Sequence, residues 1–177
     1  RALVLVDADG YHLRTVDLGH GTPILMHDGW VASWDLWLPM IELMQQDWRC
    51  IAYDHRGTGA STFPPESIAA AALVDDVFRV LDAHDIDRCV IAGESLGSVV
   101  CLQAVLRDPS RFLGLVVVSD LFLDAGGAQN AGVAETDEAR SLGVFGIAWF
   151  DGDGAHLVWR ASGWAHGKSF RECCRLP

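Results

Sequence analysis

Gly93-Glu94-Ser95-Leu96-Gly97 is the stretch of sequence that decides the fold. It follows the apolar run Cys89-Val90-Ile91-Ala92, which has the length of a buried strand, and it precedes a helical pattern at residues 99–106. A Gly-x-Ser-x-Gly motif in this context is typical of a sharp turn that holds its serine in strained dihedral angles. The flanking glycines leave room for the turn and for the helix that packs against it. The motif therefore predicts a nucleophilic serine, Ser95, at the N-terminus of a helix.

The sequence on either side of this motif alternates short apolar runs with helical patterns. Asp9-Gly10 lies between the apolar runs 3–6 and 13–16, which is a hairpin signal. Helical stretches are expected around Trp34 to Met44 and from Pro64-Pro65-Glu66 onward. Buried strands are expected at residues 24–26, 50–53, 89–92 and 115–118. This alternation predicts an α/β fold, a mostly parallel β-sheet flanked by helices.

Polar residues follow each of the predicted buried strands. These residues are His27, Asp54, Glu94-Ser95 and Asp120. Ligand chemistry in open parallel sheets is found at the carboxyl ends of the strands. We therefore expect the functional site at this edge of the sheet.

Composition narrows the partners that the chain can have. The net charge of the 177 residues is −11, and an acidic surface repels phosphate backbones, so a nucleic acid is not expected as a partner. The sequence contains no apolar run long enough to span a membrane, so no membrane partner is expected either. The five cysteines form neither a CxxC pair nor a zinc-binding pattern, and we interpret them as reduced thiols in a cytoplasmic protein.

Three motifs occur in the order that one large family uses. They are His27-Asp28-Gly29-Trp30, the loop from Asp54 to Ser61, and the Ser95 motif. The segment from about Asp9 to Asp120 resembles the α/β-hydrolase superfamily, in its branch of small esterases, enol-lactonases, haloalkane dehalogenases and cofactor-free perhydrolases. Because the residue at the turn is Ser95 and not a carboxylate, dehalogenase chemistry is disfavoured. The resemblance implies neither a metal nor an organic cofactor.

The resemblance also implies an oxyanion hole. Its donors would be the backbone N–H groups of Leu96 and Gly29, and Trp30 would line the substrate pocket. Asp28 departs from the family, which usually has glycine there, and a negative charge at this position would repel a developing oxyanion. The loop from Asp54 to Ser61 would brace the site through charge-assisted hydrogen bonds of Asp54 and Arg56.

A serine nucleophile needs a base and an acid that orients it. In the family these follow the serine in the order acid, then histidine. Only His156 and His166 follow Ser95, and the loop around His156 most resembles the family's histidine loop. Asp120 matches an acid position that a minority of the family uses, and Asp124 is the alternative. The expected catalytic set is therefore Ser95, His156 and Asp120.

The last third of the sequence differs from the first two thirds. Too few residues separate Asp120 from His156 for the family's usual cap, two further strands and their helices. We interpret residues 1–124 as the hydrolase core and residues 125–177 as a shortened, irregular C-terminal part of the same domain. An incomplete sheet would leave an open edge, so a homodimer is a further expectation.

The predicted function is a serine hydrolase that cleaves a small carboxylic ester or lactone through an acyl-enzyme at Ser95. One alternative within catalysis is a perhydrolase, which uses the same triad with peroxide in place of water. The alternative from another class is a catalytically inactive hydrolase-fold protein that binds a small molecule or a partner. The shortened C-terminal part and Asp28 favour that alternative.

Overall fold

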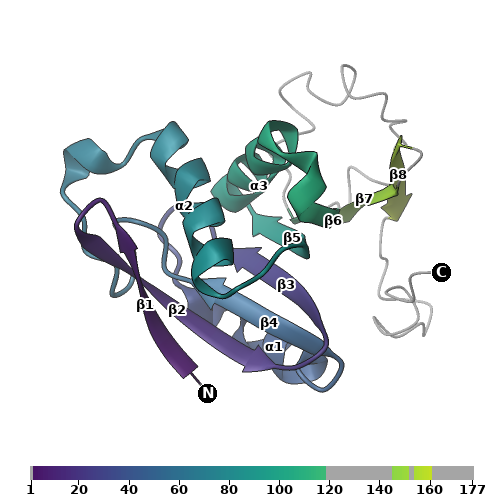
Figure 1. The fold of residues 1–177 in the computed structure, drawn as a ribbon, viewed down its shortest axis with the longest axis horizontal. Coiled ribbons are helices and arrows are strands. Elements are labelled where there is room, and N and C mark those ends of the chain that lie inside the picture. The colour runs from purple at the N-terminus through teal and green to yellow at the C-terminus, as the bar shows by residue number, and fades with distance from the viewer. Residues whose placement is uncertain (1, 119–144, 152–153, 161–177) are drawn as a thin grey trace.

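A computed structural model describes residues 2–118, 145–151 and 154–160 of the chain. Within these residues the backbone forms one mixed sheet of eight strands in the order β1-β2-β4-β3-β5-β6-β7-β8 (Figure 1). Strands β3, β4, β5 and β6 are paired in parallel with one another, which confirms the predicted α/β fold with a mostly parallel central sheet.

The first two strands form the predicted hairpin. β1 (Ala2–Ala8) pairs antiparallel with β2 (Tyr11–Gly19), and Asp9 and Gly10 connect them with positive φ angles of 57° and 82°. The four predicted buried strands are present and longer than their apolar runs. They are β3 (Thr22–His27), β4 (Trp48–Tyr53), β5 (Cys89–Glu94) and β6 (Phe112–Val118).

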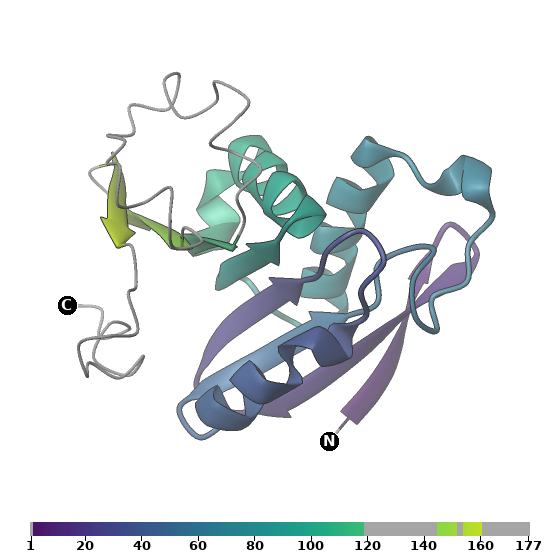
Figure 2. The same ribbon diagram turned by 180° about the vertical axis from the view of Figure 1, so that it is seen from behind.

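Helices cover both faces of the sheet, as Figures 1 and 2 show. One face carries α2 (Ala70–Ala83) and α3 (Leu96–Arg107), and the other carries α1 (Leu38–Met44) with the 3₁₀ turn η1 (Trp34–Trp37) before it. A further 3₁₀ turn, η3 (Pro109–Arg111), leads from α3 into β6.

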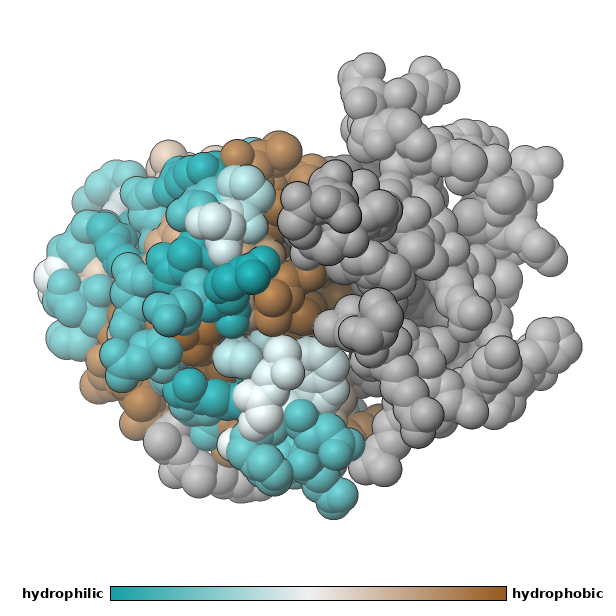
Figure 3. All heavy atoms as spheres, turned by 45° about the vertical axis from the view of Figure 1, so that its right-hand side comes forward, coloured by the Kyte–Doolittle hydropathy of each residue, from teal (hydrophilic) through white to brown (hydrophobic). Residues whose placement is uncertain are grey.

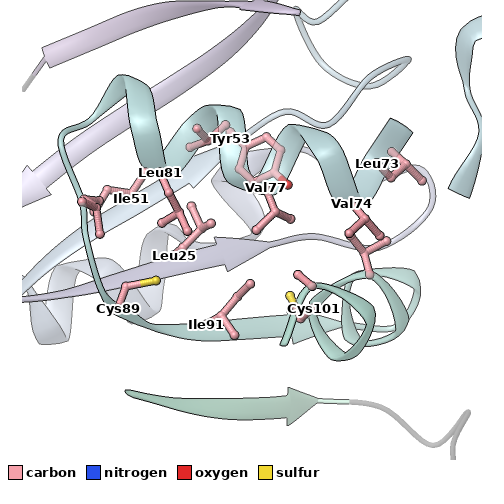
Figure 4. Packing of buried hydrophobic residues seen from close by; sticks show 14 of the residues in the cluster. Leu25, Ile51, Tyr53, Leu73, Val74, Val77, Leu81, Cys89, Ile91 and Cys101 are labelled. Carbon is pink, nitrogen blue, oxygen red and sulfur yellow. The ribbon is translucent and has the colours of Figure 1, made fainter. Parts of the chain in front are cut away.

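Successive residues of each central strand enter different cores. Leu25, Ile51 and Ile91 pack with α2 and α3, as Figure 4 shows. The adjacent residues Met26 and Cys50 pack with α1 on the opposite face. Because both faces are covered, the strands are apolar along their whole length, which is why they read as continuous hydrophobic runs. In the view of Figure 3, hydrophilic residues cover most of the described surface, with smaller hydrophobic patches between them.

The predicted helical stretch from Pro64 is interrupted. Residues Pro65–Ser67 form a 3₁₀ turn, η2, and α2 begins only at Ala70, after Ala69 in an extended conformation. The Ser67 hydroxyl donates to the Pro64 carbonyl, and the Ser67 carbonyl accepts a hydrogen bond from Arg56. These bonds fix a turn where the sequence pattern alone predicted a continuous helix.

The C-terminal part is more regular than its sequence indicated. β7 (Phe145–Asp151) and β8 (Gly154–Arg160) form an antiparallel hairpin, and β7 pairs antiparallel with β6. The expectation of irregular structure is therefore wrong for these two segments. The signal that sequence reasoning missed is Asp151-Gly152-Asp153-Gly154, a turn sequence between two apolar runs.

Candidate active site

Ser95 lies at the turn between β5 and α3, as the motif predicted. Its backbone has φ 51° and ψ −117°, a region that residues with a Cβ rarely adopt. The Ser95 N–H donates to the Val118 carbonyl of β6 at 3.1 Å, and its carbonyl accepts from the Ser98 N–H at 3.0 Å. The surrounding structure thus holds the strained turn, and strain of this kind is concentrated at functional sites.

The two glycines of the motif allow close packing around Ser95. A Cβ at Gly93 would come within 2.6 Å of the Ser98 nitrogen, and the buried Ser98 hydroxyl donates to the Gly93 carbonyl at 2.8 Å. A Cβ at Gly97 would come within 2.7 Å of the Asp28 carbonyl oxygen. The start of α3 therefore packs directly on the main chain of the loop after β3.

That loop brings Gly29 next to Ser95. A Cβ at position 29 would collide with the Glu94 carboxylate and lie 3.3 Å from the Ser95 Cβ. Leu96 is the first residue of α3, and the first N–H groups of a helix have no acceptor within it. The two backbone donors expected for an oxyanion hole thus belong to neighbours of Ser95: Leu96 follows it in the chain, and Gly29 packs against it in space.

Asp28 is buried, and this changes the expectation about its charge. Burial raises the pKa of its carboxyl to about 8, and the nearby acidic groups of Asp54, Glu94 and Asp35 contribute to the rise. Neither carboxyl oxygen has a hydrogen-bond partner among the described residues. At neutral pH the carboxyl is therefore mostly protonated, so it does not repel an oxyanion as an ionised Asp28 would.

Asp54 and Arg56 brace the site as predicted. One Asp54 oxygen accepts from the Trp34 N–H at 3.0 Å and the other from the Ala60 N–H at 2.8 Å. The Arg56 guanidinium is buried and donates two hydrogen bonds of 2.7 Å to Asp76 on α2. Both residues hold loops at the carboxyl edge of the sheet.

Sequence reasoning assigned no individual role to two further residues at this edge. Glu94 lies against Gly29, and burial raises the pKa of its carboxyl. His55 donates from Nε2 to the Gly29 carbonyl at 3.0 Å. The signal that could have found His55 is its place directly after β4, the strand next to the one that ends at His27. Trp30, the expected pocket residue, is 62% exposed.

Of the residues predicted as the base and the acid, only His156 lies within the described residues, and its backbone is far from Ser95. Asp120, Asp124 and His166 lie outside them. The backbone of His156 lies in β8, where it pairs with Trp149, which in turn pairs with Gly114 of β6. Gly114 pairs with Val90, five residues before Ser95. The His156 backbone is therefore three strand spacings across the sheet and five residues along it from Ser95. This corresponds to a distance on the order of 20 Å.

The described residues offer neither a metal site nor a membrane-spanning helix. Among the described residues, no group of three His, Cys, Asp or Glu side chains is placed to hold a metal ion. Over the same residues, no helix combines the length and the hydropathy that a membrane crossing requires.

The fold and the turn at Ser95 define a class, the α/β proteins in which a strand–turn–helix elbow presents a nucleophile. The family model described as "alpha/beta hydrolase fold" matches residues 22–150. The chain therefore belongs to the α/β-hydrolase fold family.

Individual relatives match up to about two thirds of the chain. It is 33% identical over 127 residues to the protein named "Putative carbamate hydrolase RutD" in Caulobacter vibrioides, covering 67% of this chain and 45% of that protein. The protein of the same name in Variovorax paradoxus is 38% identical over 101 residues, covering 56% and 38%. The solved structure described as "Est816 as an N-Acyl homoserine lactone degrading enzyme" has a TM-score of 0.64 at 31% identity, covering 66% and 45%. The chain thus spans less than half the length of these relatives.

Proposed function

We propose that this protein is a serine hydrolase that cleaves a small carboxylic ester or lactone through an acyl-enzyme at Ser95. The observation that carries the proposal is the strained backbone of Ser95 at the start of α3, with Gly29 packed beside it. A serine in this position can attack an acyl carbon while two backbone N–H groups face the oxygen that becomes negative.

The proposed reaction has two halves. The Ser95 Oγ bonds to the acyl carbon as its proton passes to the base, and the carbonyl oxygen becomes an oxyanion held by the N–H groups of Leu96 and Gly29. Collapse of this intermediate breaks the bond to the leaving alkoxide, which takes the proton from the base. Water then attacks the acyl-enzyme in the same way and releases the acid and Ser95.

The base and acid are proposed from the residues after β6. His156 with Asp120 is the pair expected from the sequence, and His166 and Asp124 are the alternatives. The pairing of β6, β7 and β8 counts against His156 and favours His166, because it leaves the His156 backbone far from Ser95. Comparing His156→Ala with His166→Ala tests this choice, since only the variant that lacks the base should lose activity.

The proposed substrate is small and not anionic. Glu94 lies against Gly29, and an ionised Glu94 carboxylate there makes the site unfavourable for a negatively charged acyl group. A carbamate is a second candidate, supported by the name of the RutD relatives. An ester, a lactone and a carbamate all present an acyl carbon bonded to a heteroatom, so one mechanism serves all three.

A binding protein without activity is the proposal's main rival. The observation that favours it is again the register of β8, which does not bring His156 to Ser95. A protein of this kind would keep the elbow and the oxyanion loop but leave Ser95 without a base.

The experiment that separates the two is labelling of the full chain with a fluorophosphonate probe, read by mass spectrometry. Such a probe needs an activated serine and an oxyanion hole, whatever the natural substrate. We expect one adduct at Ser95, none in Ser95→Ala, and full labelling in Ser110→Ala, which removes an exposed serine on η3. A folded protein that is not labelled would support the binding protein instead.

A further inference from the structure

Two buried histidines stack beneath the loop that carries Gly29. His27 ends β3, and His55 follows β4, the neighbouring parallel strand. Their ring centroids lie 5.3 Å apart with an angle of 20° between the planes. Both side chains are almost completely inaccessible to solvent, so their hydrogen-bonding groups must find partners inside the protein.

The two rings hold consecutive carbonyl groups of the loop. His27 Nδ1 lies 2.8 Å from the Asp28 carbonyl oxygen, and His55 Nε2 lies 3.0 Å from the Gly29 carbonyl oxygen. Because a carbonyl can only accept, each of these hydrogen bonds requires the ring nitrogen to carry a proton. The Asp28 carbonyl belongs to the same peptide group as the Gly29 N–H, so these bonds together orient the main chain on both sides of the donor.

Gly29 needs such an external restraint. Without a Cβ its backbone has a wide choice of dihedral angles, and the close approach of Glu94 and Ser95 prevents a larger residue from taking its place. A donor that must point at a developing oxyanion has to be held before the reaction begins. The histidine pair supplies that restraint from the side of the sheet.

A second carbonyl acceptor faces the His55 ring. Its Nδ1 lies 3.1 Å from the Arg56 carbonyl oxygen, so both ring nitrogens face acceptors. A neutral imidazole carries one N–H and satisfies one of them, while a cationic ring satisfies both. The Asp28 carboxyl lies 3.9 Å from His55 Nε2 and 3.8 Å from His27 Nδ1, without a hydrogen-bond partner of its own among the described residues.

We propose that His55 holds Gly29 in place as an oxyanion donor and that the neighbouring buried Asp28 carboxyl must keep its proton for this donor to act. This inference rests on the proposed hydrolase function. A protonated Asp28 carboxyl is neutral and places no negative charge beside the Gly29 N–H. Loss of the Asp28 proton to solvent leaves a buried carboxylate, with its negative charge, beside the donor.

The groups around Asp28 determine the pH at which this happens. Burial, together with Asp54, Glu94 and Asp35, which face it from three different segments, brings the pKa of Asp28 to about 8. Arg14 from β2 offsets part of this charge through its ion pair of 3.2 Å with Asp54. Burial and the neighbouring His55 lower the pKa of His27 to about 3, so His27 stays neutral and does not titrate in this range.

The test is the pH dependence of fluorophosphonate labelling of the full chain. Above pH 8 the wild-type rate constant should fall by up to about 10-fold for each pH unit, as for one essential proton. Asp28→Asn has no proton to lose there and should show no such fall. Titration of a catalytic histidine appears as a rise at lower pH, so it is separate from this limb.

Variants of His55 test the hydrogen bond itself. His55→Leu removes the donor to Gly29 and should slow phosphonylation by roughly 10²-fold without weakening reversible binding of the probe. His55→Gln retains an N–H donor and should keep most of the rate. Circular dichroism checks that each variant is folded. If His55→Leu does not fold, the pH profile of Asp28→Asn decides.

The outcomes separate this inference from the proposed function. A folded wild-type protein without any label at Ser95 contradicts the proposed function. A labelled wild type together with an alkaline fall that persists in Asp28→Asn overturns the inference and leaves the function intact. The same holds if folded His55→Leu is labelled as fast as the wild type.

Discussion

Gly29 approaches Ser95 so closely that a methyl group at position 29 would stand 3.3 Å from the Ser95 Cβ. The two residues are 66 positions apart in the chain (95 − 29), and parallel pairing of β3 with β5 brings them together. Met26 pairs with Ala92 and His27 with Gly93, so the two strands end at the same level and their loops meet. The sheet register thus assembles the nucleophile and its proposed oxyanion donor.

Gly29→Ala should reduce reactivity far more than stability. The new methyl group would displace the Glu94 carboxylate, which lies at the end of a flexible side chain, at a cost of about 1 kcal/mol or less. It would also push the loop away from Ser95, and displacing one oxyanion donor lowers rate constants by roughly 10²-fold. Labelling kinetics and a urea melt on the same sample measure both effects. Labelling at the wild-type rate would contradict the proposed role of Gly29.

Gly97→Ala should instead reduce stability. A Cβ there meets the carbonyl groups of His27 and Asp28, which are main-chain atoms and cannot move aside without shifting β3 or α3. Overpacking of this kind costs about 1–3 kcal/mol. The free energy of unfolding from urea titration should therefore fall more in Gly97→Ala than in Gly29→Ala. Equal stability of the two variants would mean that the helix start adjusts easily.

The central fold could be predicted because each strand is covered on both faces. Residues such as Leu25 and Met26 are neighbours that enter different cores, so no polar alternation breaks the apolar run. The elbow at Ser95 was predictable for a related reason, since the strained turn and close packing require the two glycines. Local steric demands of this kind leave a clear pattern in the sequence.

The charge state of Asp28 could not be predicted in this way. It depends on burial and on Asp54 and Glu94, which come from other strands and are brought near only by the sheet register. The His55 contact with Gly29 likewise joins the ends of two adjacent strands. The β7–β8 hairpin was missed because its Asp-Gly turn sequence was interpreted as part of a family loop. Long-range pairings carry little local signal, and the Asp28 and His55 features depend on them, whereas the hairpin had a local signal that was interpreted differently.

Asp75 and Asp76 are adjacent on α2 and give a matched pair of variants. Asp76 is buried and accepts two hydrogen bonds of 2.7 Å from the buried Arg56, while Asp75 pairs with Arg107 at the surface. Asp76→Asn removes the buried countercharge of Arg56, leaves only the half-exposed Asp9 as its carboxylate partner among the described residues, and should cost about 3–5 kcal/mol of unfolding free energy. Asp75→Asn should cost about 0–1 kcal/mol. Similar losses in urea titrations would mean that the Arg56 pair is not the brace described above.

Asp28→Asn should stabilise the protein, and by an amount that grows with pH. The folded state raises the pKa of Asp28 from 3.8 to about 8, so between these values the folded chain holds a proton that the unfolded chain has released. Stability from this group is fully present below about pH 4 and is lost as pH rises toward 8, by up to about 1.4 kcal/mol for each pH unit. The amide side chain of the variant has no carboxyl proton and avoids the loss.

The measurement is the difference in unfolding free energy between wild type and Asp28→Asn at pH 5, 6 and 7. We expect the difference to increase steadily across this range in favour of the variant, with Asp87→Asn as the control at an exposed position away from Asp28. A constant difference would mean that Asp28 is ionised in the folded protein at these pH values. An increase would mean that the protein gives up stability to keep a neutral carboxyl beside Gly29, as expected for a group retained for its role at the site.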